Sequence, residues 1–325
     1  MSRPAVFVTR RLPGDALERL AHHAEVRLWP GEEPPPREAL LAGVRDAQGL
    51  ICLLTDRVDA ALLDAAPRLR VVSNVAVGYD NVDVAAATAR GIPVGNTPGV
   101  LTETTADFAF ALLLAVARRV VEADRFVREG RWRQWDPNLL LGRDVHGATL
   151  GIVGMGAIGA AVARRGLGFG MRVLYTRRGG PRPDAPGDCV DLDRLLAESD
   201  FVSLHVPLTP ETRGLIGERE LRRMRPTAYL INTARGPVVD QRALARALHE
   251  GWIAGAGLDV TEEEPVDPAD PLLRAPNVVI APHIGSASHA TRSRMAEMAV
   301  ENCLAGLAGR PLPHCVNPEV EARRR

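Results

Sequence analysis

A histidine ends an apolar run in the segment VVIAPHIGSA, directly after a proline and two residues before a glycine. Imidazole is the side chain that changes charge near neutral pH, so His283 is a candidate general acid or base. A histidine at the end of a strand is, taken alone, more often structural than catalytic. The segment by itself leaves both interpretations of His283 open.

Two more segments place charged side chains after apolar runs that are typical of buried strands. Arg235 lies in INTARGPVVD, where its guanidinium could bind a carboxylate through two hydrogen bonds or form a structural ion pair. Asp259 and Glu264 lie in GLDVTEEEP, an acidic stretch that alone is usually a solvated loop. Ligands gather at the carboxyl ends of strands in open α/β sheets, so these side chains are candidates for one site.

A glycine-rich turn predicts a dinucleotide site. In GIVGMGAIGAAVARR, Gly154, Gly156 and Gly159 have G-x-G-x-x-G spacing between an apolar strand and an alanine-rich helix. The three glycines permit the tight turn, the approach of a pyrophosphate and the close packing of helix on strand. The N-terminus of the helix supplies N–H groups to the anion.

The end of the next strand bears on the choice of cofactor. An NAD site usually has a carboxylate about 20 residues after the glycines. Here VLYTRRGG supplies Thr176, Arg177 and Arg178, which suit a ribose 2′-phosphate. We therefore expect NADP(H) to be preferred and NAD(H) to remain possible, although the two arginines could also be a solvated surface pair.

The elements that position these residues alternate between short β-branched runs and helical stretches, which predicts an α/β fold with mostly parallel sheets. Apolar runs such as AVFVTR, GLICLLTD and LRVVSNVAV indicate one small sheet domain in the first hundred residues. A long amphipathic helical stretch is expected from about Thr102 to Val127. A second series of strands then starts at ATLGIVGMG.

Composition narrows the function classes. The 325 residues carry 40 basic and 40 acidic side chains, so no net charge points to nucleic acid or a membrane surface. All the basic residues are arginine, which excludes lysine Schiff-base chemistry and a Walker lysine. The spacing of the histidines and the four cysteines predicts no metal site and reduced thiols. Without a signal peptide or a long apolar span, we expect a cytoplasmic protein.

Several motifs in the same order resemble the D-isomer-specific 2-hydroxyacid dehydrogenases, most closely their glyoxylate/hydroxypyruvate reductase branch. The similarity covers nearly the whole chain and is carried by ICLLTDRVD, VSNVAVGYDNVD, GIPVGNTPGVLTETTADFAFALLLA, the glycine turn, NTARGPVVD, GLDVTEEEP and PHIGSA.

The resemblance implies a catalytic trio. Arg235 would bind the substrate carboxylate and polarise the keto oxygen, and His283 would deliver a proton to that oxygen. Glu264 would hydrogen-bond the histidine and favour its charged form. A hydride from the nicotinamide would reduce a small 2-keto acid, glyoxylate or hydroxypyruvate, to the D-2-hydroxy acid.

The resemblance also implies binding residues. Backbone N–H groups of Val77 and Gly78 would hold the substrate carboxylate, Leu53 would line the pocket, and Trp135 or Trp132 would reach the neighbouring subunit. The implied cofactor contacts are Gly154, Met155, Gly156, Ala157, Ile158, Gly159, Thr176, Arg177, Arg178, His205, Pro207, Thr233, Ala234, Asp259 and Ser286. Many relatives have arginine where this chain has Ala157, so one phosphate contact is in doubt.

The implied architecture is a Rossmann-like doubly wound cofactor domain, residues 100–286, inserted into a smaller flavodoxin-like α/β substrate domain, residues 1–99 and 287–325. Substrate would bind between the domains, and hinge closure would exclude water. The long helix and the loop after it would form a two-fold homodimer.

Three alternatives stay open. Transcriptional co-repressors that sense nicotinamide resemble these enzymes and keep the trio, although they tend to carry extra tails. Phosphoglycerate and D-lactate dehydrogenases share the chemistry, but the former commonly have a further regulatory domain. Formate dehydrogenase relatives lack the glutamate that Glu264 provides.

Overall fold

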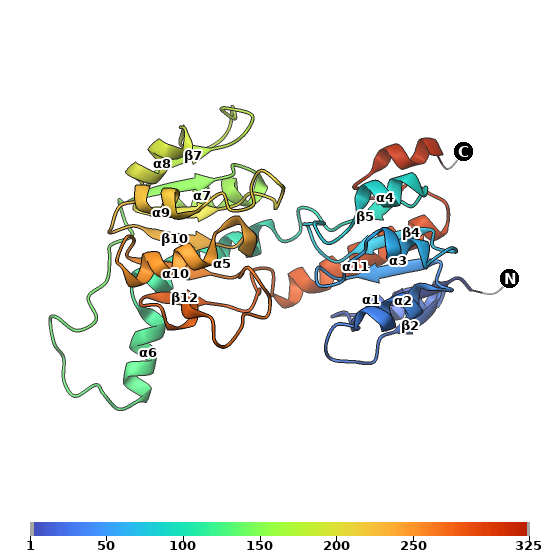
Figure 1. Cartoon of the computed structure of the whole chain (residues 1–325), viewed down its shortest axis with the longest axis horizontal. Coiled ribbons are helices and arrows are strands. Elements are labelled where there is room, and N and C mark those ends of the chain that lie inside the picture. The colour runs from blue at the N-terminus through green and yellow to red at the C-terminus, as the bar shows by residue number, and fades with distance from the viewer. Residues whose placement is uncertain (1–2, 324–325) are drawn as a thin grey trace. The chain divides into compact units, whose positions relative to one another are not determined.

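The computed structural model describes residues 3–323. By its internal contacts the chain forms two compact units, Met1–Leu101 with Ala287–Arg325, and Thr102–Ser286. Each unit contains one sheet with helices packed against it (Figure 1).

The first unit contains a five-stranded parallel sheet in the order β2-β1-β3-β4-β5. This is the strand order of flavodoxin-like sheets, as predicted. The elements in chain order are β1 (Ala5–Val8), α1 (Ala16–His23), β2 (Glu25–Leu28), α2 (Arg37–Val44), β3 (Gly49–Cys52), α3 (Ala60–Asp64), β4 (Val71–Asn74), α4 (Val84–Ala89), β5 (Val94–Gly95), α11 (His289–Leu307) and the 3₁₀ helix η3 (Pro318–Arg323).

The second unit contains a seven-stranded parallel sheet in the order β12-β11-β10-β9-β6-β7-β8. The elements in chain order are α5 (Thr102–Ala117), α6 (Val120–Arg128), β6 (Thr149–Val153), α7 (Ala157–Gly168), β7 (Arg172–Thr176), β8 (Asp188–Cys189), α8 (Leu192–Glu198), β9 (Phe201–Leu204), α9 (Glu218–Arg223), β10 (Tyr229–Asn232), η1 (Gly236–Val238), α10 (Gln241–His249), β11 (Gly255–Leu258), η2 (Pro271–Arg274) and β12 (Val278–Ile280). Counted from β6, this is the doubly wound Rossmann order with one strand added, which confirms the predicted fold class.

The central strands of the second sheet are mostly apolar, because helices cover both of its faces. Along β10, Tyr229 and Ile231 belong to the hydrophobic cluster that includes α5 and α7. Leu230, between them, belongs to the cluster that includes α8, α9 and α10. Successive side chains of a strand point to opposite faces, so helices on both faces favour apolar residues at consecutive positions.

The first sheet is built in the same way. Val6 and Val8 of β1 pack in the cluster that contains Ala299 and Val300 of α11. Phe7 points to the other face, into the cluster that holds residues of α2 and α3. The C-terminal helix α11 therefore completes the core that the first hundred residues begin.

One expectation about the helices was wrong, and two short strands were missed. The predicted continuous helix from Thr102 to Val127 is divided into α5 and α6, because Arg119 has a left-handed backbone with φ of 55°. Strand β2 was not predicted, because its sequence EVRL has only four residues, of which two are charged. The two-residue strand β8, at the opposite edge of the other sheet, was also missed.

Other features concern membranes, metals and thiols. Across residues 3–323, every helix is too short or too polar to cross a bilayer. The same part of the chain contains no group of three His, Cys, Asp or Glu side chains suited to a metal ion. Cys52, Cys189 and Cys303 are free thiols, and burial raises the pKa of Cys303 to about 12. The Sγ atom of Cys315 lies 3.6 Å from Oδ1 of Asn317.

Candidate active site

Glu264 and His283 form the central contact of the candidate site. The Oε2 atom of Glu264 lies 2.7 Å from Nδ1 of His283, and both side chains are partly exposed, at 31% and 24%. The other carboxylate oxygen of Glu264 accepts a hydrogen bond of 3.3 Å from the N–H of Thr261. A carboxylate on Nδ1 fixes the orientation of the imidazole and directs Nε2 away from the pair.

The backbone of His283 is held in an uncommon conformation. Its φ is 55°, in the left-handed region that few non-glycine residues adopt. Asp259 holds this turn: its carbonyl accepts from the N–H of His283 at 2.9 Å, and its carboxylate accepts from the N–H groups of Ile284 and Gly285 at 2.7 Å each. Burial raises the pKa of Asp259, and these two hydrogen bonds to its carboxylate oppose the rise. Backbone strain held by surrounding bonds is typical of functional sites.

The loop that carries Arg235 packs on the turn that carries Glu264. Arg235 follows β10 and donates from Nη1 to the carbonyl of Ala234 at 2.8 Å, while Asn232 donates to the carbonyl of Arg235 at 3.0 Å. The next residue is Gly236, where a Cβ atom would overlap the carbonyl oxygen of Thr261. Only glycine allows the two backbones to approach this closely, so Gly236 brings the two charged segments together.

The glycine turn has the geometry that a dinucleotide requires. Gly154 has φ of 100°, and a Cβ there would lie 2.6 Å from the carbonyl oxygen of His205. Gly156 begins α7 without a capping side chain. Apart from its chain neighbours, nothing in residues 3–323 comes within 4 Å of a Cβ built on Gly156. The turn therefore leaves space for a phosphate at a helix N-terminus.

Thr233 supplies an independent test of fit. Its Oγ1 atom is buried and has no hydrogen-bond partner within the described part of the chain. Buried hydroxyl groups are nearly always hydrogen-bonded, so an orphan one at the end of β10 fits a site that a ligand completes. The neighbouring N–H of Ala234 is already bound by Asn232 at 3.0 Å.

The predicted nucleotide-selecting residues are exposed at the end of β7. Arg178 forms an ion pair of 3.3 Å with Glu211, and both side chains are more than half exposed. The carbonyl of Thr176 accepts from the N–H of Gly154 at 3.0 Å, which joins this strand end to the glycine turn. Arg182, which the sequence did not single out, donates to the carbonyl of Met155 at 3.4 Å. The guanidinium of Arg182 therefore lies beside the glycine turn, in which Ala157 has no charged side chain.

His205 lies at the end of β9, beside the glycine turn. Its Nε2 atom is 2.8 Å from the hydroxyl of Ser203, and burial lowers its pKa to about 3. The imidazole of His205 is therefore neutral at physiological pH.

Two other predicted cofactor contacts lie on loops of the second unit. The carbonyl of Pro207 accepts a hydrogen bond from the hydroxyl of Thr212, and Ser286, the last residue of the unit, is partly exposed.

The predicted substrate residues Leu53, Val77 and Gly78 follow strands β3 and β4 in the first unit. Two asparagines that sequence reasoning missed join their loops. Asn74 donates to the carbonyl of Gly78 at 3.0 Å and to Asn81 at 3.1 Å, and Asn81 donates to the carbonyl of Leu53 at 3.0 Å. The motif VSNVAVGYDN contains both asparagines, at a spacing of seven residues, and this was the available signal.

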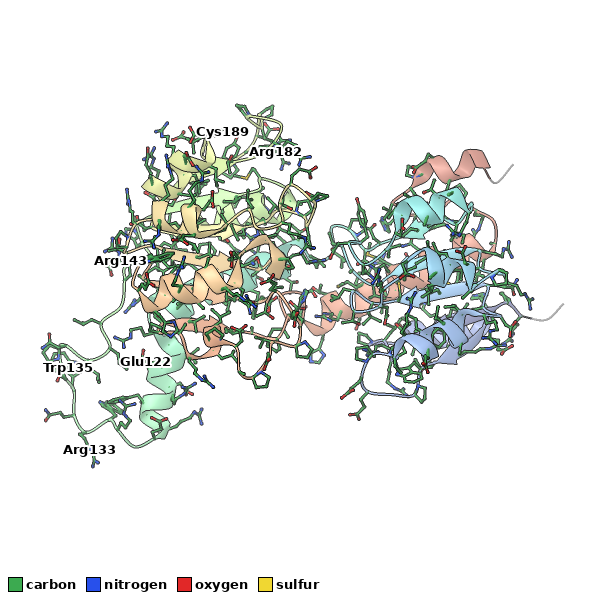
Figure 2. All side chains as sticks on the ribbon, viewed as in Figure 1. Glu122, Arg133, Trp135, Arg143, Arg182 and Cys189 are labelled. Carbon is green, nitrogen blue, oxygen red and sulfur yellow. The ribbon has the colours of Figure 1, made fainter. Side chains whose placement is uncertain are left out.

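Helix α6 and the loop after it expose apolar side chains. No residue of α6 is buried, and Val120, Val121 and Val127 are about half exposed. Trp132 and Trp135 are 58% and 78% exposed. Figure 2 shows Trp135 on the loop that extends beyond α6, away from the sheet of its own unit.

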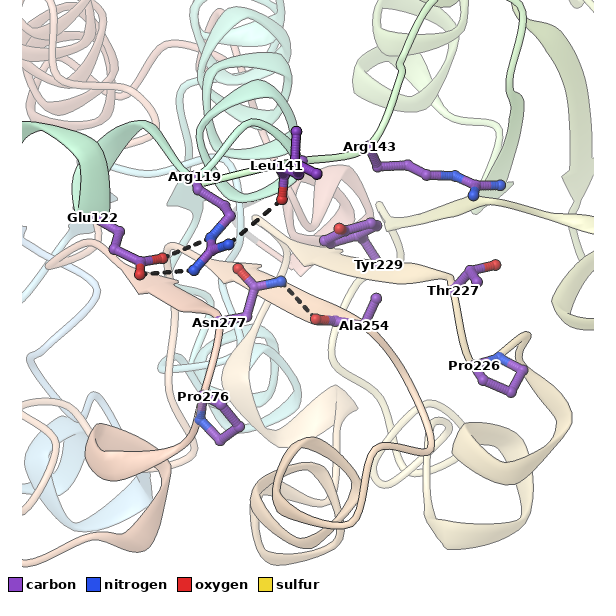
Figure 3. Close-up of a pocket in the computed structure, with 11 residues that line it drawn as sticks. Arg119, Glu122, Leu141, Arg143, Pro226, Thr227, Tyr229, Ala254, Pro276 and Asn277 are labelled. Atoms are coloured by element: carbon purple, nitrogen blue, oxygen red, sulfur yellow. Dashed lines mark hydrogen bonds and ion pairs between the residues drawn. The ribbon is translucent and has the colours of Figure 1, made fainter. Parts of the chain in front are cut away.

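A pocket of about 550 Å³ lies elsewhere in the second unit (Figure 3). Its lining includes Tyr229 at the start of β10, Ala254 directly before β11 and Asn277 directly before β12. These are the N-terminal ends of the strands, whereas Arg235, Asp259 and His283 follow the C-terminal ends. Arg119 in its wall is paired with Glu122 at 2.8 Å. The pocket is therefore separate from the candidate active site.

Comparison with known proteins identifies what this arrangement is similar to. The family profile described as "D-isomer specific 2-hydroxyacid dehydrogenase, NAD binding domain" matches residues 110–285. A glyoxylate reductase of Korarchaeum cryptofilum is 61% identical over 322 residues, which are 98% of this chain and 97% of that protein. A glyoxylate reductase of Thermococcus litoralis is 52% identical over 98% of both chains.

Solved structures agree with these relatives. A Thermus thermophilus protein is 54% identical, with a TM-score of 0.92 over 96% of this chain and 99% of that one. The NADPH-dependent glyoxylate/hydroxypyruvate reductase of Sinorhizobium meliloti, in complex with NADP and malonate, is 36% identical. Its TM-score is 0.85, and the match covers 98% of each chain.

Proposed function

The chain belongs to the D-isomer specific 2-hydroxyacid dehydrogenase family, and we propose that it reduces glyoxylate, and with it hydroxypyruvate, using a nicotinamide cofactor. The observation that carries this proposal is the 2.7 Å contact between Glu264 and Nδ1 of His283. Relatives of high identity named glyoxylate reductase support the choice of substrate. The regulatory and other dehydrogenase alternatives gain no such support.

The residues divide the chemistry between binding and proton transfer. With Nδ1 directed at Glu264, Nε2 of His283 delivers the proton to the keto oxygen, and the carboxylate stabilises the imidazolium that donates it. Arg235 binds the substrate carboxylate and polarises the keto group. The bound nicotinamide supplies the hydride that the keto carbon accepts. Leu53, Val77 and Gly78 contribute to holding the substrate.

The glycine turn and its neighbours hold the cofactor. Gly156 and the N-terminus of α7 receive the pyrophosphate, and Thr233 offers its buried hydroxyl. The remaining predicted contacts, from Met155 through Ile158 and at His205, Pro207, Ala234, Asp259 and Ser286, belong to the same proposal. The reaction so described needs no metal ion.

A steady-state panel tests the reaction. Glyoxylate, hydroxypyruvate, pyruvate and a longer 2-keto acid would each be assayed with NADH and with NADPH. We expect the highest kcat/KM for glyoxylate or hydroxypyruvate, because the relatives of high identity are named glyoxylate reductases. A preference for the longer acids, or no oxidation of either cofactor, would overturn the proposal.

Replacing both Arg177 and Arg178 by alanine should raise KM for NADPH by about 10-fold or more and leave KM for NADH nearly unchanged. The reason is that hydrogen bonds to a charged group are worth about 1.5–3 kcal/mol, and only NADPH carries the 2′-phosphate. The measurement is KM for each cofactor at saturating glyoxylate.

The matched control is Glu211→Gln, which removes the ion-pair partner of Arg178 and keeps both arginines. That variant should bind NADPH at least as well as the parent. An equal rise in KM for the two cofactors in the double alanine variant would show that these arginines do not select the nucleotide.

The proposal includes a homodimer. The exposed valines of α6 and the exposed tryptophans of the following loop form an apolar surface suited to a second copy, and Trp135 is the proposed contact with the neighbouring subunit's substrate. A cytoplasmic location stays a prediction from the sequence.

A further inference from the structure

Gln241 is a buried side chain of the second unit that makes two partly buried hydrogen bonds. It is the first residue of α10 and is 8% exposed. Its Oε1 atom accepts from the N–H of Glu262 at 2.8 Å, and its Nε2 atom donates to Oδ2 of Asp270 at 2.8 Å. A backbone N–H only donates and a carboxylate only accepts, so these partners fix the orientation of the amide.

The bond to Glu262 ties α10 to the turn that carries Glu264. Within this turn the Thr261 hydroxyl donates to the carbonyl of Glu263 at 2.6 Å, and the Thr261 N–H donates to the carboxylate of Glu264. Gln241 adds a bond from outside the turn, at its second residue. Gln241 also follows Arg235 by only six positions in the chain.

We propose that Gln241 is a positioning residue for the catalytic pair, which holds the turn Thr261–Glu264 so that the carboxylate of Glu264 meets Nδ1 of His283. This inference rests on the proposed function. Asp270 is its partner: one carboxylate oxygen caps η2 by accepting from the N–H of Leu272 at 2.8 Å, and the other orients the amide of Gln241.

The test exchanges the donor and the acceptor of the Gln241–Asp270 bond. Gln241→Glu keeps the acceptor for the N–H of Glu262, but it places a carboxylate oxygen next to the carboxylate of Asp270, so the hydrogen bond between the two side chains is lost. Asp270→Asn keeps the oxygen that caps η2, but it places an NH₂ group next to the NH₂ group of Gln241, and the same hydrogen bond is lost. Each single substitution should lower kcat/KM for glyoxylate by about 10-fold, since small displacements of catalytic groups have effects of this order or larger. The KM for the cofactor should not change.

The double substitution Gln241→Glu with Asp270→Asn restores one donor facing one acceptor. It should return kcat/KM to within about 3-fold of the parent, which is the non-additive behaviour of two residues in contact. The matched control is Asp267→Asn, in the same loop, whose side chain accepts, among residues 3–323, only from the N–H of Ala269. This control should behave as the parent does.

A pH profile separates positioning from general stability. A displaced Glu264 stabilises the protonated imidazole less, so the alkaline limb of kcat/KM for reduction should move to lower pH in each single variant, and return in the double variant. Asp259, a second carboxylate that interacts electrostatically with His283, is unchanged in all of them. Glu264→Gln gives the reference shift in the same direction.

The kinetics and pH profiles of these variants either support or overturn the role of Gln241 as a positioning residue. Parent-like kcat/KM and pH profiles in the single variants, or a double variant that stays as impaired as the singles, would overturn the role of Gln241. If Gln241→Glu does not fold, Asp270→Asn and the double variant carry the same comparison. Failure of the parent to reduce any 2-keto acid would instead count against the proposed function.

Discussion

Replacing His283 by alanine should lower kcat for glyoxylate reduction by about 10²–10⁴-fold, the range that a positioned general acid contributes. The side chain that would donate the proton is removed, while the glycine turn and α7 are untouched. The dissociation constant for NADPH, measured by its fluorescence, should therefore stay within about 2-fold of the parent value, a difference well under 1 kcal/mol.

His249→Ala is the matched control, because His249 ends α10 and its Nδ1 lies 2.8 Å from a backbone carbonyl of its own helix, that of Ala245. It should retain parent turnover. Near-parent turnover in His283→Ala would remove the proposed proton donor. Loss of NADPH binding together with activity would instead indicate a structural histidine, the alternative that the sequence left open.

Replacing Arg235 by alanine should lower kcat/KM for glyoxylate by about 10²–10³-fold, the effect of removing one preorganised donor to a developing negative charge. Arg235→Lys should recover only part of this loss. Lysine keeps the charge, but it lacks the planar fork that binds a carboxylate through two bonds. The measurements are kcat and KM for glyoxylate at saturating NADPH.

The matched arginine control is Arg242→Ala, at the exposed position of α10 directly after Gln241. It should leave kcat and KM unchanged. If Arg235→Ala and Arg242→Ala gave the same kinetics, Arg235 would be an ordinary surface or structural charge, and the carboxylate would have to bind elsewhere.

The order of apolar runs along the chain was sufficient to predict the fold class. Strands such as AYLINTA and FVSLHV are apolar at most positions because helices cover both faces of a parallel sheet. The edge strand β2 escaped prediction because its solvent-facing positions are charged, and α5 and α6 were joined because a left-handed residue such as Arg119 leaves no mark in a hydrophobic pattern.

The functional motifs were likewise evident from the chain alone, because glycine spacing, a histidine after a proline and an arginine before a glycine are local features. The sequence therefore determined the family and which residue types could do the chemistry.

The resemblance already implied a hydrogen bond between Glu264 and His283, and the tertiary structure gave its atoms, Oε2 and Nδ1. Only the tertiary structure bound the turn after His283 to Asp259 and placed Gln241 behind the acidic turn. These are contacts between residues 19 to 25 positions apart. Their partners are chosen by the sheet register and by close backbone approaches such as that at Gly236, which no local pattern encodes.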